Sequence, residues 1–270
     1  MEVISLKDHE FHQFRDMIHR VAGIHMSDVK KALIGGRLSK RLKHHNLSSY
    51  GEYFDYLSQE RQEMQVAVDL LTTNETYFFR EPKHFDLLRG RVIPDLLRDN
   101  REFRIWSGAC SSGEEPYSLA MTLADSLGDR PWSVLGSDIS SRVLHKARSG
   151  HYDLEAAGKI PRPYLIRHCL KGMGAQEGTF LIDPKLRERV RFQQINLNAE
   201  LPELGEFDVI FLRNVMIYFN ADTKRQVLRR MLPKLRPGGY FIVSHSESLN
   251  GVTDALRPIV PSVYRKPERA

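Results

Sequence analysis

The sequence lacks several features that would place it in a specialised class of protein. Only two of its 270 residues are cysteine, Cys110 and Cys169, so neither a disulfide framework nor a cysteine-based metal site is expected. The longest apolar stretches, such as residues 207–212, are far shorter than the ~20 residues that span a bilayer. The N-terminus has charged residues among its apolar ones instead of the apolar segment of a signal peptide. We therefore expect a cytoplasmic protein without direct membrane insertion.

The composition is that of an ordinary globular protein, with 41% hydrophobic and 27% charged residues. The formal net charge of +6 indicates an acidic partner. Nucleic acid, an anionic membrane and an acidic protein surface all satisfy that condition, and the charge alone does not choose among them.

The N-terminal quarter has a helical pattern. Apolar residues recur at spacings of three and four between residues 6 and 71, where proline is absent. A polar cluster, an aromatic pair and Pro82 then interrupt the pattern. We predict an all-α domain over residues 1–73 and a linker over 74–82 that contributes to the functional site.

Residues 83–270 alternate short apolar runs with helical stretches, which favours an α/β fold with a doubly wound, mostly parallel sheet. Strands are predicted at 103–106, 132–136, 190–193, 207–212 and 240–244, and helices at 115–126, 140–148 and 222–235. A last antiparallel strand is expected at 260–265, at the sheet edge because Pro258 and Pro261 exclude it from the centre. Residues 150–189 interrupt the alternation and predict an inserted small antiparallel β-subdomain with a strand at 179–182.

The strongest local motif is at residues 105–116, where a strand leads through a glycine-containing loop into a helix. Gly108 and Gly113 would let the backbone approach a ligand, and Ser111 or Ser112 would cap the helix. Glu114 at the helix start would repel a diphosphate but attract an ammonium group. The alternative is that Glu114 and its neighbour Glu115 only complement the helix dipole.

Two further strand ends carry polar residues. Asp138 follows the second strand and is suited to the two hydroxyls of a ribose, although it would equally cap the next helix. The strand at 207–212 leads to Arg213, Asn214 and Tyr218 at the same end of the sheet.

Together these segments resemble the chemotaxis receptor glutamate methyltransferases, the CheR family of S-adenosylmethionine-dependent methyltransferases. The segments that carry the resemblance are TTNETYFFRE at 72–81, GEEPYS at 113–118, SDI at 137–139 and RNVMIYF at 213–219. The resemblance implies a methyltransferase-type fold, S-adenosylmethionine as cofactor, S-adenosylhomocysteine as product and no metal. The cofactor-binding residues that it implies, together with the glycine loop, are Asn74, Thr76, Arg80, Gly108, Ala109, Glu114, Asp138, Asn196, Leu197 and Asn214.

Methyl transfer to a glutamate needs no general base, because a carboxyl group with a pKa near ~4.3 is already ionised at neutral pH. Positioning is then the main task of the enzyme. Arg80, Arg213 and Tyr218 are the predicted catalytic residues, since guanidinium and hydroxyl groups orient a carboxylate. For Arg213, a surface salt bridge is the alternative.

A basic stripe is predicted on the N-terminal domain. Lys30, Arg37, Lys40 and Arg41 fall within ~100° of a helical projection. Such a stripe is commonly just a solvated face, but the resemblance implies docking on acidic chemoreceptor helices. The inserted segment also resembles the β-subdomain by which some relatives bind a receptor C-terminal peptide, and the strand at 179–182 is the candidate for edge addition. The alternative is a lid or stabilising element without a partner.

Of three functions considered, the sequence favours the first. The first is a monomeric enzyme that methylates chemoreceptor glutamates and binds no nucleic acid. The second is a methyltransferase acting on nucleic acid or a small molecule. The third is a non-catalytic scaffold that senses S-adenosylmethionine.

Overall fold

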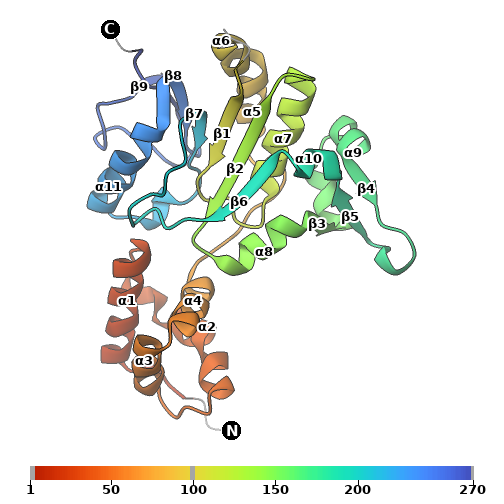
Figure 1. Cartoon of the computed structure of the whole chain (residues 1–270). Helices are drawn as coiled ribbons and strands as arrows, with labels where there is room; N and C mark the ends of the chain where they lie inside the picture. The colour runs from red at the N-terminus through yellow and green to blue at the C-terminus, as the bar shows by residue number, and fades with distance from the viewer. Residues whose placement is uncertain (1–3, 98–100, 269–270) are drawn as a thin grey trace.

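The computed structural model describes residues 4–97 and 101–268. An all-α N-terminal domain lies beyond one end of the strands of a large sheet, and a small β-subdomain projects to one side (Figure 1). The N-terminal domain contains α1 (Asp8–Ala22), α2 (Lys31–His44), α3 (Tyr50–Gln59) and α4 (Arg61–Leu71), with a 3₁₀ turn at Asp28–Lys30 before α2. The predicted helical domain is confirmed.

Buried side chains explain why these helices pack together. Phe14 and Ile18 of α1 meet Leu38 of α2 and Tyr53 of α3, and all four are inaccessible to solvent. Glu10 of α1 is also buried, because its carboxylate accepts the backbone N–H groups of Lys7 (2.8 Å) and Gly51 (2.8 Å). One carboxylate therefore caps α1 and ties it to α3.

The large sheet has the strand order β6-β2-β1-β7-β8-β10-β9. Its strands are β1 (Phe103–Ser107), β2 (Trp132–Asp138), β6 (Val190–Gln194), β7 (Phe207–Phe211), β8 (Leu235–Ile242), β9 (Arg257–Val260) and β10 (Val263–Arg265). The strands from β6 to β8 pair in parallel, whereas β10 pairs antiparallel with β8 and β9. The predicted doubly wound, mostly parallel sheet is confirmed.

Helices cover both faces of this sheet, so the central strands β1, β2, β7 and β8 are largely buried on both sides, whereas the edge strand β9 is mostly exposed. Ile105 of β1 packs in the core that contains α7 (Glu114–Leu127), together with α5 (Lys83–Leu87), a π-helical turn (Leu88–Val92) and α6 (Ile93–Leu96). Trp106, one residue later, packs in the core that contains α11 (Ala221–Met231). Alternate side chains of a strand therefore enter different cores.

Three predicted elements differ in extent from those observed. The expected helix at 222–235 stops at Met231 and continues only as a 3₁₀ turn (Leu232–Lys234) that contains Pro233, because proline cannot supply the N–H that an α-helix interior needs. Strand β8 begins at Leu235, five residues before the predicted start at Tyr240. The single strand expected at 260–265 is a hairpin of β9 and β10, with Pro258 on the outermost strand.

The inserted region forms the predicted small antiparallel sheet. It contains β3 (His151–Asp153), β4 (Cys169–Lys171) and β5 (Thr179–Ile182), and α8 (Ser141–Ser149), α9 (Arg162–His168) and α10 (Pro184–Arg187) accompany it. Strand β5 is the central strand, paired with β3 on one side and β4 on the other. The expectation that a peptide adds to residues 179–182 is therefore wrong, since both edges of β5 are already bonded.

The two domains are joined by direct contacts as well as by residues 72–82, which form no helix or strand. Ile24 pairs as an isolated bridge with Phe219, and the His25 N–H donates to the Tyr218 carbonyl (2.7 Å). Asp69 of α4 accepts from the Ser141 hydroxyl (2.8 Å) at the start of α8. The contacts hold the helical domain over the carboxyl ends of the strands. Within the described residues, no helix combines the length and apolar character needed to cross a membrane.

Candidate active site

A cavity lies between the helical domain and the carboxyl ends of the strands. Its walls come from residues 22–26 and the start of α2, from residues 71–76 and 80 of the connection, and from the loops after β1, β2, β6 and β7. In parallel α/β sheets, this is the end where ligands bind. Every predicted cofactor residue lines this cavity except Glu114, as do Arg80, Arg213 and Tyr218.

The loop after β1 has its glycines for two different reasons. Gly108 lines the cavity, and a Cβ there would stand 3.0 Å from Met231 Cε. Gly113 does not line the cavity. It has a φ of 97°, and a Cβ would stand 2.9 Å from the Cβ of Ala147 and from the Tyr152 hydroxyl. The expectation that Gly113 allows close approach to a ligand is therefore wrong, because its backbone conformation and the packing of α8 already require glycine.

Neither serine of this loop caps α7, whose N-cap is Gly113 without a side-chain cap bond. The Ser111 hydroxyl donates instead to the Asn74 carbonyl (2.8 Å) and attaches the loop to the connection between the domains. The Ser112 hydroxyl donates to Glu114 Oε2 (2.7 Å). The expected capping role is therefore wrong.

Asp138 is fixed at the end of β2. Its Oδ2 accepts the Ser111 N–H (2.9 Å) and its Oδ1 accepts the Ser140 N–H (2.9 Å). Burial raises the pKa of this carboxyl, against the lowering effect of both N–H groups. Ser140, not Asp138, supplies the N-cap oxygen of α8, so the capping alternative for Asp138 does not hold.

Glu114 and Glu115, at the start of α7, lie in different environments. Glu114 is buried beside Ser112, and burial raises its pKa. Glu115 lines the cavity, where its Oε1 accepts the Ser107 hydroxyl (2.7 Å) and its Oε2 accepts Arg213 Nη1 (2.8 Å). Adjacent helical residues project ~100° apart, so only one of the pair faces the cavity, and it is not the predicted one.

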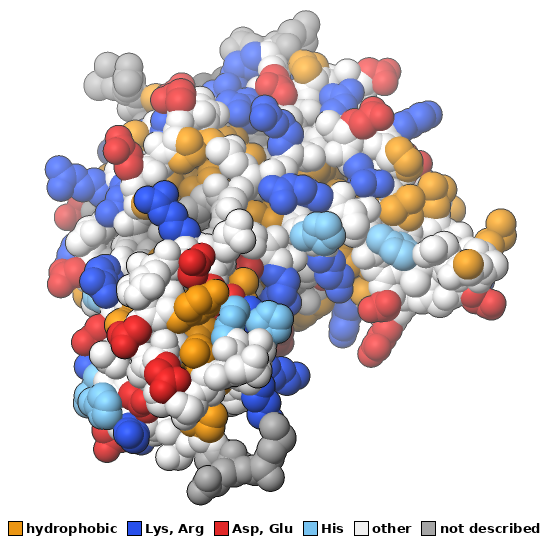
Figure 2. Space-filling model, turned by 60° about the horizontal axis from the view of Figure 1, so that its bottom comes forward, with side chains coloured by type: hydrophobic (Ala, Val, Ile, Leu, Met, Phe, Trp, Pro, Cys, Tyr) orange, Lys and Arg blue, Asp and Glu red, His pale blue; other side chains and the backbone are white. Residues whose placement is uncertain are grey.

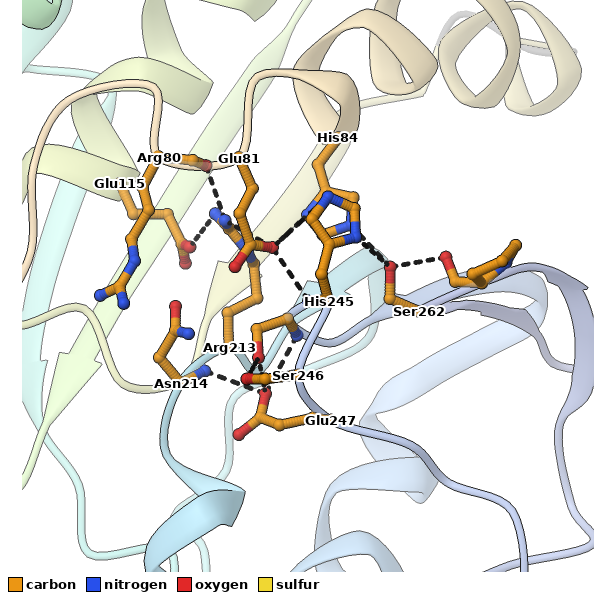
Figure 3. Close-up of polar contacts among 12 residues, drawn as sticks. Arg80, Glu81, His84, Glu115, Arg213, Asn214, His245, Ser246, Glu247 and Ser262 are labelled. Carbon is orange, nitrogen blue, oxygen red and sulfur yellow. Dashed lines mark hydrogen bonds and ion pairs between the residues drawn. The ribbon is translucent and has the colours of Figure 1, made fainter.

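Arg213 is a buried residue, only 5% exposed, which excludes the surface salt bridge considered as its alternative. Nη1 contacts Glu115, whereas Nη2 donates to the Arg80 carbonyl (2.6 Å) and lies 3.2 Å from Glu81 Oε2 (Figure 3). Its Nε has no hydrogen-bond partner among the described residues. Arg213 thus fixes the segment that carries Arg80, and its guanidinium is already engaged by two carboxylates.

Arg80 is only lightly held. Its Nη1 donates to the Glu75 carbonyl (3.0 Å) and its guanidinium lies 5.6 Å from the Tyr77 ring centroid. The flanking residues Phe79 and Glu81 have φ of 53° and 58°, in the left-handed region that non-glycine residues rarely adopt. Such strain is concentrated at functional sites. Tyr218 lines the same cavity, from the 3₁₀ turn Met216–Tyr218 that follows β7.

The remaining predicted cofactor residues lie around the same cavity. Asn196 and Leu197 follow β6, and Asn196 Nδ2 donates to the Val21 carbonyl (2.6 Å) of the helical domain. Asn214 has a φ of 57°, and its N–H donates to Glu247 Oε2 (2.9 Å). Thr76 lines the wall formed by the connection, beside Arg80.

The basic stripe is not a uniform surface. Lys30 and Lys40 are exposed, and Lys30 reaches the cavity rim. Arg37 instead donates to the carbonyls of Leu71 (2.9 Å) and Thr72 (3.1 Å), and Arg41 donates to Glu63 through Nε (2.7 Å) and Nη2 (2.7 Å). Two of the four predicted partner-binding cations are therefore engaged within the domain.

Three groups of residues at the site were not predicted from the sequence. Glu115 was seen but not chosen. Glu81 and Glu247 organise Arg213 and Asn214, and residues 22–26 close the cavity from the helical domain. Glu81 could have been predicted as a site residue, because it is the neighbour of the predicted residue Arg80. For Glu247 and residues 22–26 no local pattern indicates the contact, since it depends on distant segments.

The sheet with its antiparallel β10 beside β8, and a cavity with carboxylates at the strand ends, define an S-adenosylmethionine-dependent methyltransferase. Residues 74–264 match the CheR methyltransferase, SAM binding domain, and residues 9–72 match the CheR methyltransferase, all-alpha domain. The chain therefore belongs to the CheR methyltransferase family.

Curated relatives agree with this assignment. The chain is 43% identical to chemotaxis protein methyltransferase 2 of Pseudomonas aeruginosa over 258 residues, covering 94% of this chain and 92% of that protein. It is 41% identical to the chemotaxis protein methyltransferase of Escherichia coli over 254 residues, covering 92% of this chain and 87% of that protein. S-adenosylmethionine-dependent methylation in chemotaxis is the activity these matches support.

Proposed function

We propose that this protein transfers methyl groups from S-adenosylmethionine to glutamate side chains of chemoreceptor cytoplasmic domains. The products are glutamyl methyl esters and S-adenosylhomocysteine, and the reaction serves sensory adaptation. The observation that carries the proposal is the lightly held guanidinium of Arg80 at a cavity with acids at two strand ends. A protein with this function acts in the cytoplasm.

The donor set of the cavity fits the cofactor. Glu115 presents a carboxylate suited to the ammonium group of the methionine portion. We assign this role to Glu115 in place of Glu114, because Glu115 lines the cavity. Asp138, held by two backbone N–H groups, keeps oxygen lone pairs for ribose hydroxyls. Asn196 and Leu197 would lie against the adenine, and Asn74 and Thr76 against the methionine end.

When bound, S-adenosylmethionine would supply an electrophilic sulfonium methyl group for attack by a carboxylate oxygen, with S-adenosylhomocysteine as the leaving group. The protein residues have to orient that carboxylate and exclude water. Arg80 is the orienting group, because its guanidinium has one hydrogen bond and can turn towards a substrate. Tyr218 offers a hydroxyl group from the turn after β7. Arg213 is a positioning residue, since it holds the Arg80 carbonyl and both neighbouring carboxylates.

The proposed partner of this protein is a receptor helix that carries acidic residues. Lys30 and Lys40 are exposed cations of the stripe, and a second cleft beside the cavity is lined by Arg37 together with Arg142 and Lys146 of α8. Figure 2 shows basic side chains distributed over this side of the molecule with acids between them. Electrostatic attraction of this kind steers association and weakens with salt.

A receptor C-terminal peptide is a second contact that we include in the proposal. Ile166, Leu170 and Met173 are exposed apolar residues of the β-subdomain. Figure 2 shows hydrophobic side chains on the part of the molecule that projects to the right. Because β5 is central, a peptide strand would have to add at β3 or β4.

The decisive experiment is transfer of labelled methyl from S-adenosylmethionine to purified receptor cytoplasmic fragments, followed by mild base. A glutamyl ester releases its label as methanol, whereas methylated amines and nucleobases retain it. Substitution of the modified glutamates in the fragment by alanine should abolish labelling. Base-stable product, or label found only in nucleic acid or a small molecule, would contradict the proposal, and absence of any transfer would favour a non-catalytic scaffold.

A further inference from the structure

Three potential metal ligands converge next to Arg213 but outside the cavity lining. Glu81 belongs to the connection, His84 to the first turn of α5, and His245 to the loop after β8 (Figure 3). One ligand atom from each lies within 4.8 Å of the other two. His84 and His245 have no role in the methyl transfer described above, and Glu81 takes part only through its ion pair with Arg213.

His84 is held as a ligand is usually held. Its side chain is 3% exposed, and its Nε2 lies 2.8 Å from the Ser262 hydroxyl oxygen. The Ser262 hydroxyl has one proton, which it donates to the Pro261 carbonyl (2.5 Å). Its oxygen therefore accepts from His84 Nε2–H, and the neutral ring carries a lone pair on Nδ1.

That lone pair faces a negative group. His84 Nδ1 has no hydrogen-bond partner in residues 4–97 and 101–268 and lies 3.4 Å from Glu81 Oε2. A buried lone pair opposite a carboxylate is unfavourable unless a cation lies between them. Glu81 Oε2 itself is paired with the His245 N–H (3.1 Å) and with Arg213 Nη2 (3.2 Å), so among the described residues it is His84 Nδ1 that is left without a partner.

The spacing matches a metal ion. Zinc–nitrogen and zinc–oxygen bonds of ~2.0–2.1 Å at tetrahedral angles place two ligand atoms ~3.3 Å apart. The Nδ1 to Oε2 distance is 3.4 Å, and His245 Nε2 lies 3.9 Å from the same oxygen. The His245 side chain is 47% exposed, so its ring is free to adjust and solvent can reach a fourth position.

We propose that Glu81, His84 and His245 form a binding site for a transition-metal ion, with zinc as the best-suited ion. Two imidazoles and one carboxylate with an open position suit Zn²⁺ better than Mg²⁺ or Ca²⁺, which prefer oxygen ligands. Ser262 orients the His84 ring through the hydrogen bond between its hydroxyl oxygen and Nε2, the ring nitrogen that does not face the metal.

Arg213 competes for the same carboxylate oxygen, since its Nη2 lies 3.2 Å from Glu81 Oε2. Arg213 keeps Glu115 and the Arg80 carbonyl as partners if Glu81 turns away. An ion at this place would therefore join the Arg80–Glu81 segment to α5 and to the loop after β8. The metal would act beside the transfer site without belonging to it.

The test is titration of the full chain with Zn²⁺ alone by calorimetry, with Co²⁺ absorption as a spectroscopic readout. We expect one site-specific ion per chain and a higher melting temperature with metal, because an ion that binds only the folded state stabilises it. His245→Ala should lose about tenfold or more in affinity, as expected when a ligand is removed. His145→Ala, an exposed histidine of α8, is the matched control and should bind as the unmodified protein does.

His245 is chosen because, unlike His84, it is exposed, so its removal leaves the core intact. Absence of Zn²⁺ uptake by the unmodified protein would overturn the proposal, as would equal affinity in His245→Ala. The measurement involves no methyl transfer, so its failure would leave the proposed enzymatic function untouched.

Discussion

Arg213 donates from Nη1 to Glu115 Oε2 over 2.8 Å, and this ion pair joins the residues after β7 to the first turn of α7. Both side chains are largely buried, at 2% and 13% exposed. The pair closes the base of the proposed cofactor site, so a change in either residue affects both the fold and ligand binding.

Arg213→Ala should destabilise the protein by about 3–5 kcal/mol, because Glu115 and Glu81 would lose their buried counter-charge. Chemical denaturation with the far-UV circular dichroism signal measures this change. Arg225→Ala is the control, since Arg225 pairs with Asp222 at the surface and should change stability by less than about 1 kcal/mol. Equal stability of the two variants would contradict the structural role of Arg213.

Arg80→Ala should lower methyl transfer by about a hundredfold or more, because loss of the orienting group misplaces the substrate carboxylate. Its melting temperature should stay unchanged, since the side chain has one backbone hydrogen bond and a ring contact. Receptor-fragment labelling and differential scanning calorimetry supply the two readouts. Unchanged turnover would refute the assignment of Arg80.

Glu115→Gln should weaken binding of S-adenosylhomocysteine by about tenfold or more, because a charge-assisted contact to the ammonium group would be lost. Glu114→Gln is matched in chemistry and sequence position but does not line the cavity, and should bind within about twofold of the unmodified protein. Isothermal calorimetry compares the two variants. A larger loss in Glu114→Gln would reverse their roles.

Acid should destabilise the helical domain through Glu63. Burial opposes the charge of Glu63, but hydrogen bonds from Arg41, Tyr53 and His45 prevail and lower its pKa to about 2, from a usual value of 4.5. Because the folded pKa is the lower one, the stabilisation is complete above about pH 4.5 and is lost as pH falls towards 2. The difference in unfolding free energy between the unmodified protein and Glu63→Gln should therefore shrink across that range. A difference that does not vary with pH would contradict the low pKa.

Lys40→Ala and Arg41→Ala should separate partner binding from stability. Lys40 is exposed, so its loss should weaken association with an acidic receptor fragment at low salt and leave the melting temperature unchanged. Arg41→Ala should lower the melting temperature, because it leaves Glu63 without its bidentate partner. Surface binding and calorimetry distinguish these effects. Equal melting temperatures would show that Arg41 belongs to the surface stripe.

The amino-acid sequence alone determined the alternation of strands and helices and the strand ends at Asp138 and Arg213. The hydrophobic periodicity and the positions of proline and glycine affect the structure of only a few neighbouring residues. Their effects can therefore be predicted without knowledge of the tertiary structure. The predicted helix at 222–235 ran past Pro233, although this proline is a local signal for the helix end at Met231. The early start of β8 could not be predicted locally, because its pairing with β7 depends on distant residues.

Only the tertiary structure decided which polar residues meet. It placed Glu115 and not Glu114 in the cavity, engaged Arg41 with Glu63, and made β5 the central strand of its small sheet. Each outcome depends on contacts between segments far apart in the chain. Local periodicity places a side chain on a face of a helix or strand, but the partner on that face is set by how the domains pack.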